Sequence, residues 1–168
     1  MSVRLDGTVV QDIPITECAK IIRKELKKAF PDMAFSVRSH SYSMGCHVSV
    51  HWEDGPTCES VDQKISWISG RTFDGMDDST HYHDTEWNGR KVHFAGSSPS
   101  TSRTVTKYKE KRALAEGLLE SMCVVETTPH GYKMFGNQYL SNLADRVVYQ
   151  QDYVKGESMT ETIERVVF

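Results

Sequence analysis

Histidine and arginine side chains recur at alternate positions in the segment FSVRSHSYSMGCHVSVHW, residues 35–52. Alternation of polar and apolar residues is typical of β-strands that bury one face, and the central Tyr-Ser-Met-Gly is turn-like. We expect a hairpin centred between Ser43 and Met44. The pairs on its apolar face would be Val37–Val50 and Phe35–Trp52. The opposite face would carry Ser36, Arg38, His40, His47 and His51. Because guanidinium and imidazole groups donate hydrogen bonds to phosphate oxygens, this face is a candidate anion-binding surface.

A basic helix is expected just before the hairpin, in the run ECAKIIRKELKKAF. Thr16 is the expected N-cap, and Pro31 is expected to end the helix. Apolar residues recur every three or four positions, which predicts one buried side. The residues of that side are Cys18, Ile22, Leu26 and Ala29. Much of the remaining circumference is occupied by Lys20, Arg23, Lys24, Lys27 and Lys28.

An acidic loop with histidines follows, between residues 71 and 94. Its potential metal ligands are Asp74, Asp77, Asp78, His81, His83 and Asp84. Converging carboxylates and imidazoles can hold Mg²⁺, Mn²⁺ or Zn²⁺ and activate a water molecule. Their spacing matches neither an EF-hand nor a zinc motif, and aspartates beside glycines are also typical of turns. We therefore assign no metal, no cofactor and no catalytic residue, and keep a metal-dependent nuclease or hydrolase as an alternative.

Cysteine chemistry gives a weaker indication of catalysis. A nucleophilic pair could join Cys46 or Cys58 to His51 or His93, but Cys46 alternates with His47 and so points to the other face. Cys58 belongs to an apolar helical stripe, where a small buried side chain is the commoner role. The chain has no GxSxG, HExxH or phosphate-binding glycine loop. Widely spaced cysteines without a CxxC pair indicate free thiols and a cytoplasmic location.

The order of elements predicts an α+β fold. A second helix should begin after Thr57 and end at Gly70, giving a helix–strand–strand–helix module with a small antiparallel sheet. Residues 91–94 should add a short strand to that sheet, and residues 96–102 read as a flexible joint. Beyond the joint we expect a mainly helical region with a helix capped by Asn137 and a terminal TETIERVVF that is a helix or an edge strand. The expected domains are residues 1–95 and 96–168.

Charge is unevenly distributed along the 168 residues, although the net charge is only −3. Residues 17–38 contain six Lys or Arg against three acidic residues, and residues 53–86 contain nine acidic residues against two basic ones. Residues 103–112 are basic again, with five basic residues and one acidic residue. Such blocks commonly form solvated faces of different elements. No apolar run is long enough to span a bilayer, and the N-terminal residues do not resemble a secretory signal.

Several strings resemble the large polyvalent protein-associated domain of type 29, a family found in phage, prophage and conjugative-element proteins. They are AKIIRKELKKAFPDMAFSVRSHSYSMG, HVSVHWEDGPT, RTFDGMDD and WNGRKVHF, in that order, and cover about Thr16 to Phe94. The resemblance implies a mobile-element accessory module, associated with counter-defence or with establishing incoming DNA. It supplies no catalytic residues.

Two binding functions follow, and we favour both over catalysis. The first is binding of DNA or RNA by the basic helix and the polar hairpin face. Its expected contact residues are Lys20, Arg23, Lys24, Lys27, Arg38, His40, Tyr42, His47 and His51. The basic block at residues 103–112 could extend this surface. The second function is inhibition of a host defence protein, in which the acidic loop and its aromatic residues make the contact. Neither function requires a membrane.

Overall fold

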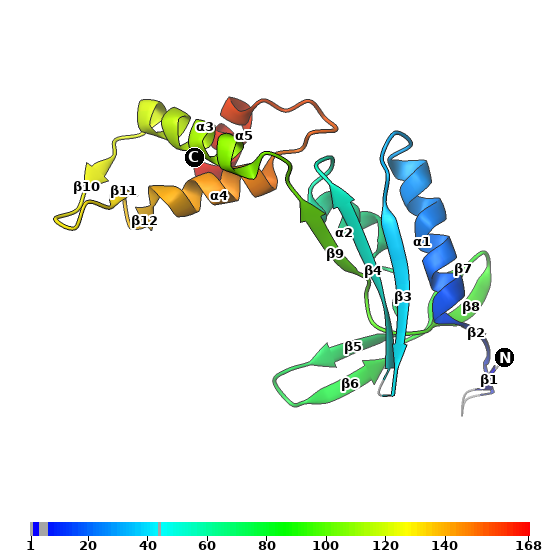
Figure 1. Cartoon of the computed structure of the whole chain (residues 1–168). Helices are drawn as coiled ribbons and strands as arrows, with labels where there is room; N and C mark the ends of the chain where they lie inside the picture. The colour runs from blue at the N-terminus through cyan, green and yellow to red at the C-terminus, as the bar shows by residue number, and fades with distance from the viewer. Residues whose placement is uncertain (1, 4–6, 44) are drawn as a thin grey trace. The chain divides into compact units, whose positions relative to one another are not determined.

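The computed structural model describes residues 2–3, 7–43 and 45–168 (Figure 1). It divides the chain into two compact units, each with its own apolar core. The first unit contains the residues up to Trp52 together with Cys58–Arg103, and the second contains Glu53–Thr57 and Thr104–Phe168. Helices and strands are mixed, and the C-terminal region is mainly helical, which confirms the α+β class. None of the described helices is both long and apolar enough to cross a bilayer.

The predicted hairpin is formed by β3, Ser36–Tyr42, and β4, Gly45–Glu53. Its register is the expected one, with Val37 opposite Val50 and His40 opposite His47. Met44, half of the predicted turn centre, lies outside the described residues. A third strand, β9, Ser100–Thr104, pairs with β4 and gives the order β3-β4-β9.

The flexible joint predicted for residues 96–102 is therefore wrong. Ser100 donates a hydrogen bond to the Val48 carbonyl at 3.5 Å, and Thr101 donates one to Asp62 at 2.8 Å. Small hydroxyl residues resemble a linker in composition, yet here they complete a sheet edge and connect it to a helix.

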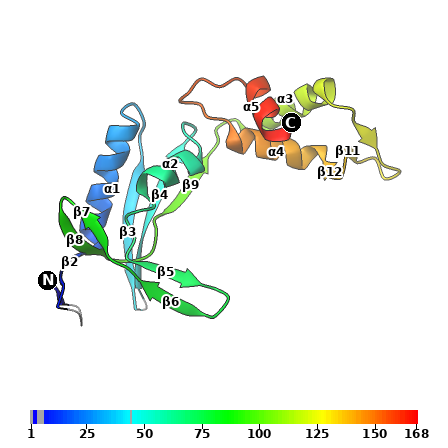
Figure 2. The same ribbon diagram turned by 180° about the vertical axis from the view of Figure 1, so that it is seen from behind.

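Helices α1, Ile15–Ala29, and α2, Cys58–Ile65, cover one face of this sheet, as the two opposite views show (Figures 1 and 2). Ile22 and Leu26 of α1 pack in the same cluster as Val37 and Trp52. Burying these side chains supplies the main driving force for folding the first unit. The same packing leaves the histidine-bearing face of the sheet uncovered by α1 and α2.

Two predicted helix ends are wrong. Pro14, and not Thr16, occupies the N-cap position of α1, and its carbonyl accepts the N–H groups of Glu17 and Cys18. Proline suits this position because its fixed φ favours the start of a helix. Helix α2 stops at Ile65, before Gly70. Gly70 is needed instead for close packing, since a Cβ there would lie 1.8 Å from the Phe94 carbonyl oxygen.

A second sheet has the order β1-β2-β8-β7. Its strands are β1, Ser2–Val3; β2, Val9–Ile13; β8, Arg90–Phe94; and β7, Thr85–Trp87. The predicted strand near residues 91–94 exists as β8, but it pairs in parallel with β2 and does not join the hairpin sheet. A separate hairpin is formed by β5, Arg71–Asp74, and β6, Ser79–Tyr82.

The second unit packs three helices: α3, Tyr108–Met122; α4, Leu140–Gln150; and α5, Met159–Val167. A small sheet contains β10, Glu126–Thr127; β11, Lys133–Phe135; and β12, Gln138–Tyr139. Helix α4 follows Tyr139, so the predicted cap at Asn137 is wrong. The C-terminal segment is the helical alternative, begun by a capping box between Ser158 and Glu161.

Candidate nucleic-acid interface

The open face of the β3-β4-β9 sheet carries a connected group of aromatic and hydroxyl side chains, which we call the polar face. His40 and His47 stack with ring centroids 4.9 Å apart, and the Tyr42 ring lies 5.9 Å from His47. Two histidines are held by serines: His40 Nε2 lies 3.1 Å from Ser49 Oγ, and His51 Nδ1 lies 3.1 Å from Ser102 Oγ. The predicted histidines are therefore brought together, and β9 adds a serine that the hairpin prediction did not include.

Arg38 stands on the same face, opposite Ser49 in the strand register. Strand residues two positions apart point to the same side, so Arg38 shares its side with Ser36, His40 and Tyr42. Arg38 is exposed, and no carboxylate pairs with it within the described part of the chain. It is thus free to bind an anion.

A second guanidinium reaches the polar face from outside the hairpin. Arg71, the first residue of β5, places its two terminal nitrogens 2.7 and 3.1 Å from the position that a Cβ on Gly45 would take. Gly45 alternates with His47 and pairs with Tyr42, so a Cβ there would point onto the polar face. Arg71 therefore fills the end of the polar face nearest the hairpin turn.

Sequence reasoning missed Arg71 because it opens the acidic loop at residues 71–94 and lies 26 positions after Gly45. In the sequence, Gly45 indicates only a turn. The side chain of Arg71 has no ion-pair partner among the described residues. The structure thus provides two available guanidinium groups where the sequence predicted one.

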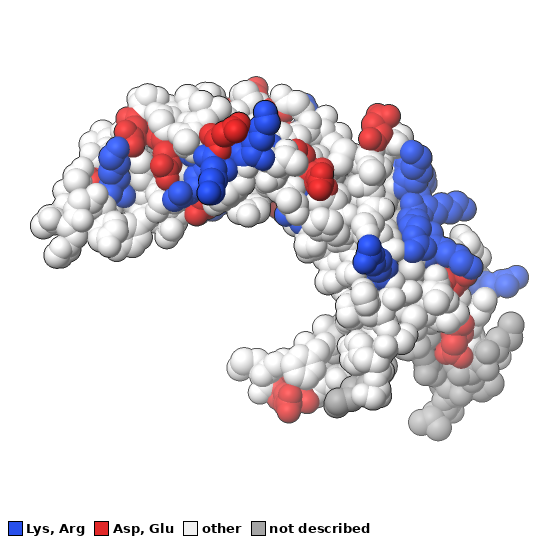
Figure 3. Space-filling view, in the orientation of Figure 1, with Lys and Arg blue, Asp and Glu red and all other residues white. Residues whose placement is uncertain are grey.

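The basic residues of α1 form a neighbouring surface. Figure 3 shows Lys and Arg side chains gathered along α1, beside β3. Arg23 donates a hydrogen bond to the Val37 carbonyl at 2.6 Å, and Lys27 donates one to the Pro31 carbonyl at 2.6 Å. Lys20 pairs with Glu17 at 2.9 Å, which partly neutralises it. Because α1 packs on the apolar face of the sheet, these cations meet the polar face only at the edge formed by β3.

Three of the five cations in the basic block at residues 103–112 are engaged within the protein. Arg103 is only 8% exposed. Lys111 pairs with Asp54 at 2.8 Å, and Arg112 pairs with Asp145 at 2.7 Å. These three cations therefore contact other parts of the protein, whereas Lys107 and Lys109 are exposed. That the block extends the binding surface stays a prediction.

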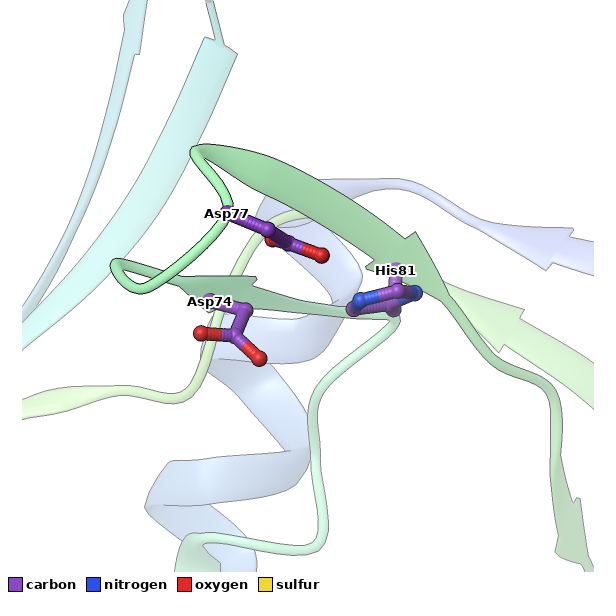
Figure 4. Close-up of side chains that lie close together, drawn as sticks. All are labelled: Asp74, Asp77 and His81. Carbon is purple, nitrogen blue, oxygen red and sulfur yellow. The ribbon is translucent and has the colours of Figure 1, made fainter.

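The acidic loop brings together three of its six predicted metal ligands. Asp74, Asp77 and His81 lie at the tip of the β5–β6 hairpin, each with a ligand atom within 4.8 Å of the others (Figure 4). All three residues are exposed. Asp74 accepts the Met76 N–H at 2.9 Å, and Asp77 accepts the Ser79 N–H at 3.0 Å. Both carboxylates therefore already stabilise the turn.

Two thiols, those of Cys18 and Cys58, do not resemble activated nucleophiles. Burial raises the pKa of Cys18 to about 11 and also raises the pKa of Cys58. A catalytic thiol requires a lowered pKa and a base within hydrogen-bond reach. The environments of Cys18 and Cys58 therefore favour structural roles.

The sequence matches large polyvalent protein associated domain 29 over residues 13–108, more than half of the chain. The chain belongs to this family. No curated protein and no solved structure matches it.

Membership in the polyvalent protein associated domain 29 family links the chain to phage and other mobile elements. The matched segment contains α1, the polar face and the β5–β6 hairpin, and ends at the first residue of α3. The family match therefore contains every residue of the candidate interface. It also includes Arg71 and Ser102, which the hairpin prediction did not include.

Proposed function

We propose that this chain is a non-catalytic accessory protein of a phage or mobile element that binds nucleic acid in the cytoplasm. The observation that carries the proposal is the polar face: Arg38 and Arg71 stand at separate positions along a row of imidazoles, serines and a tyrosine. Guanidinium groups bind phosphates, and aromatic rings stack on bases that are not paired. Single-stranded DNA or RNA is therefore the favoured ligand.

Each part of the surface has a distinct role in this proposal. Arg38 and Arg71 bind phosphates, while Tyr42 and the His40–His47 stack contact bases. His51 adds a donor at the far end of the face. Across the edge of β3, Arg23, Lys24 and Lys27 contact neighbouring phosphates, and Lys20 contributes less because Glu17 competes for it.

The test is fluorescence anisotropy with labelled 20-nucleotide single-stranded DNA, single-stranded RNA and duplex DNA across a salt titration. We expect the single strands to bind more tightly than the duplex, and binding to weaken as salt rises. Arg90→Ala is the matched control, because Arg90 is an exposed arginine of β8, outside both surfaces. If no oligonucleotide binds at 20 mM salt, or if binding does not weaken as salt rises, nucleic acid is excluded as the ligand.

A host defence protein is the second candidate partner, and one observation favours it. The acidic β5–β6 hairpin exposes large side chains, with Phe73 62% and Tyr82 68% exposed. Exposed aromatics beside carboxylates can insert into a basic pocket of a protein that binds DNA. A counter-defence role by this route requires Phe73 and Tyr82, whereas nucleic-acid binding requires Arg38 and Arg71.

A further inference from the structure

A groove separates α1 from β3, on the side of β3 away from the polar face. Its volume is about 460 Å³. The apolar side chains that line it are Leu26, Met33, Phe35 and Val37, and the cations are Arg23, Lys24 and Lys27. None of the described residues that line the groove is acidic. A ligand that fits this surface must combine apolar groups with negative charge.

The cations are held in position without being neutralised. Arg23 and Lys27 donate to the backbone carbonyls of Val37 and Pro31, which orients both side chains but leaves their charge in place. Lys24 is exposed, and the described residues offer it no carboxylate partner. Three positive charges therefore surround an apolar floor and attract carboxylates or phosphates.

The lining favours a peptide over a nucleobase. The Phe35 ring already contacts Phe30 at 5.8 Å and Trp52 at 5.5 Å, so stacking on a base would compete with these contacts. The charged side chains can only donate hydrogen bonds, so they cannot read the donor groups of a base. Val37 has its carbonyl occupied by Arg23, which opposes addition of a peptide strand at that point of β3. Insertion of side chains from a helix or an irregular segment meets none of these obstacles.

We propose that this groove binds an acidic peptide segment of a partner protein. One or two aliphatic or aromatic side chains of the segment enter between Leu26 and Met33. Carboxylates on either side of them pair with Lys24 and Lys27. The groove thus gives the chain a protein-binding site that is separate from the polar face.

The experiment selects a displayed library of random 14-residue peptides against the full chain and counter-selects against Met33→Gln. The best enriched peptide is then labelled, and its affinity is measured by anisotropy for the parent chain and four variants. Lys24→Glu tests the positive charge at the edge of the groove, and Met33→Gln tests its apolar lining. Lys28→Glu is the matched control because Lys28 lies on the same helix but outside the groove lining, and Arg38→Ala controls for the polar face.

We expect enriched peptides to carry acidic residues next to apolar ones. Their affinity should fall about tenfold in Lys24→Glu and about threefold in Met33→Gln, and stay within about twofold in Lys28→Glu and Arg38→Ala. Equal losses in Lys24→Glu and Lys28→Glu overturn the proposal, because they would reflect diffuse charge attraction. Failure to enrich any peptide, or enrichment of peptides without acidic residues, also overturns it. If Met33→Gln weakens oligonucleotide binding as much as peptide binding, the groove takes a base instead.

Discussion

Removing both guanidinium groups from the polar face should change the salt dependence of nucleic-acid binding by a calculable amount. Five of the cations proposed to contact phosphates lack a carboxylate partner among the described residues. They are Arg23, Lys24, Lys27, Arg38 and Arg71. For single strands, each phosphate contact contributes about 0.7 to the slope of log affinity against log salt concentration. Five contacts therefore give a slope of about −3.5.

The Arg38→Ala, Arg71→Ala double variant retains three of these contacts, so its slope should be about −2.1. Between 50 and 200 mM salt, the parent chain should lose about 100-fold in affinity and the double variant about 20-fold. Each single variant should lie halfway, at about −2.8. Arg71 lies beside Gly45 and Arg38 lies opposite Ser49, and these two positions are about 13 Å apart along β4. At that separation, the effects of the two single substitutions on the slope should add.

The assay is anisotropy of a labelled 20-nucleotide single strand at five or more salt concentrations, with Arg90→Ala measured in parallel. Circular dichroism and a thermal melt show that each variant is folded. Arg71→Lys refines the test, because lysine keeps the charge but loses the planar donor fork. We expect it to restore the slope and only part of the affinity.

An unchanged slope in the double variant would falsify the assignment of the polar face. An equal reduction in Arg90→Ala would show that total charge, and not position, determines binding. If Arg38→Ala lowers the slope but Arg71→Ala does not, the extension of the polar face beyond Gly45 is wrong.

Three further predictions concern stability and reactivity. Asp54 lies in the second unit, where burial alone would raise its pKa, but hydrogen bonds from Lys111 and Thr106 outweigh burial and lower it. The stabilisation that ionised Asp54 gives to the folded state is present above its unfolded pKa, near 3.8, and is lost as pH falls through its lower folded pKa. Asp54→Asn, which still tolerates the positive φ, should lower the free energy of unfolding by about 1–2 kcal/mol at pH 7 and remove this acid dependence in urea melts. Because burial raises the pKa of Cys18 to about 11, iodoacetamide at pH 8 should label it only after unfolding, as mass spectrometry would show. Asp74→Ala should change oligonucleotide affinity by less than about twofold, since the carboxylate bonds its own turn; a loss above tenfold in anisotropy would instead support a metal site.

The β3–β4 register was predictable because its signals are local. Alternation assigns Val37 and Val50 to one side, and the turn position decides which residues face one another. The same local reasoning identified the basic side of α1 and three of the four residues predicted to be buried, whereas Ala29 is exposed. Where a period of two or 3.6 residues determines a contact, the sequence was sufficient.

Contacts between distant segments were not predictable in this way. Strand β2 contains only five residues, and its parallel pairing with β8 joins positions about 80 residues apart in the chain. Strand β9 has hydroxyl residues where strands usually carry apolar ones. Its extended conformation depends on backbone pairing with β4, which is distant in the sequence. Arg71 reaches the polar face only because β5 starts beside Gly45, and no pattern in residues 71–74 indicates that contact.

Strand β3 places two different chemistries on opposite sides of one backbone. Arg38, His40 and Tyr42 face the polar side, whereas Phe35 and Val37 line the groove or the core. Because side chains alternate, a slip of one residue in the β3–β4 pairing would exchange these sets. It would bury a guanidinium and imidazoles without partners and expose the apolar residues, at a cost of several kcal/mol. The pairing that stabilises the core therefore also places the polar face and the groove on opposite sides of β3. The two proposed ligands share Arg23, Lys24 and Lys27 at the edge of the strand, so an acidic peptide should displace those phosphate contacts and leave the polar face open.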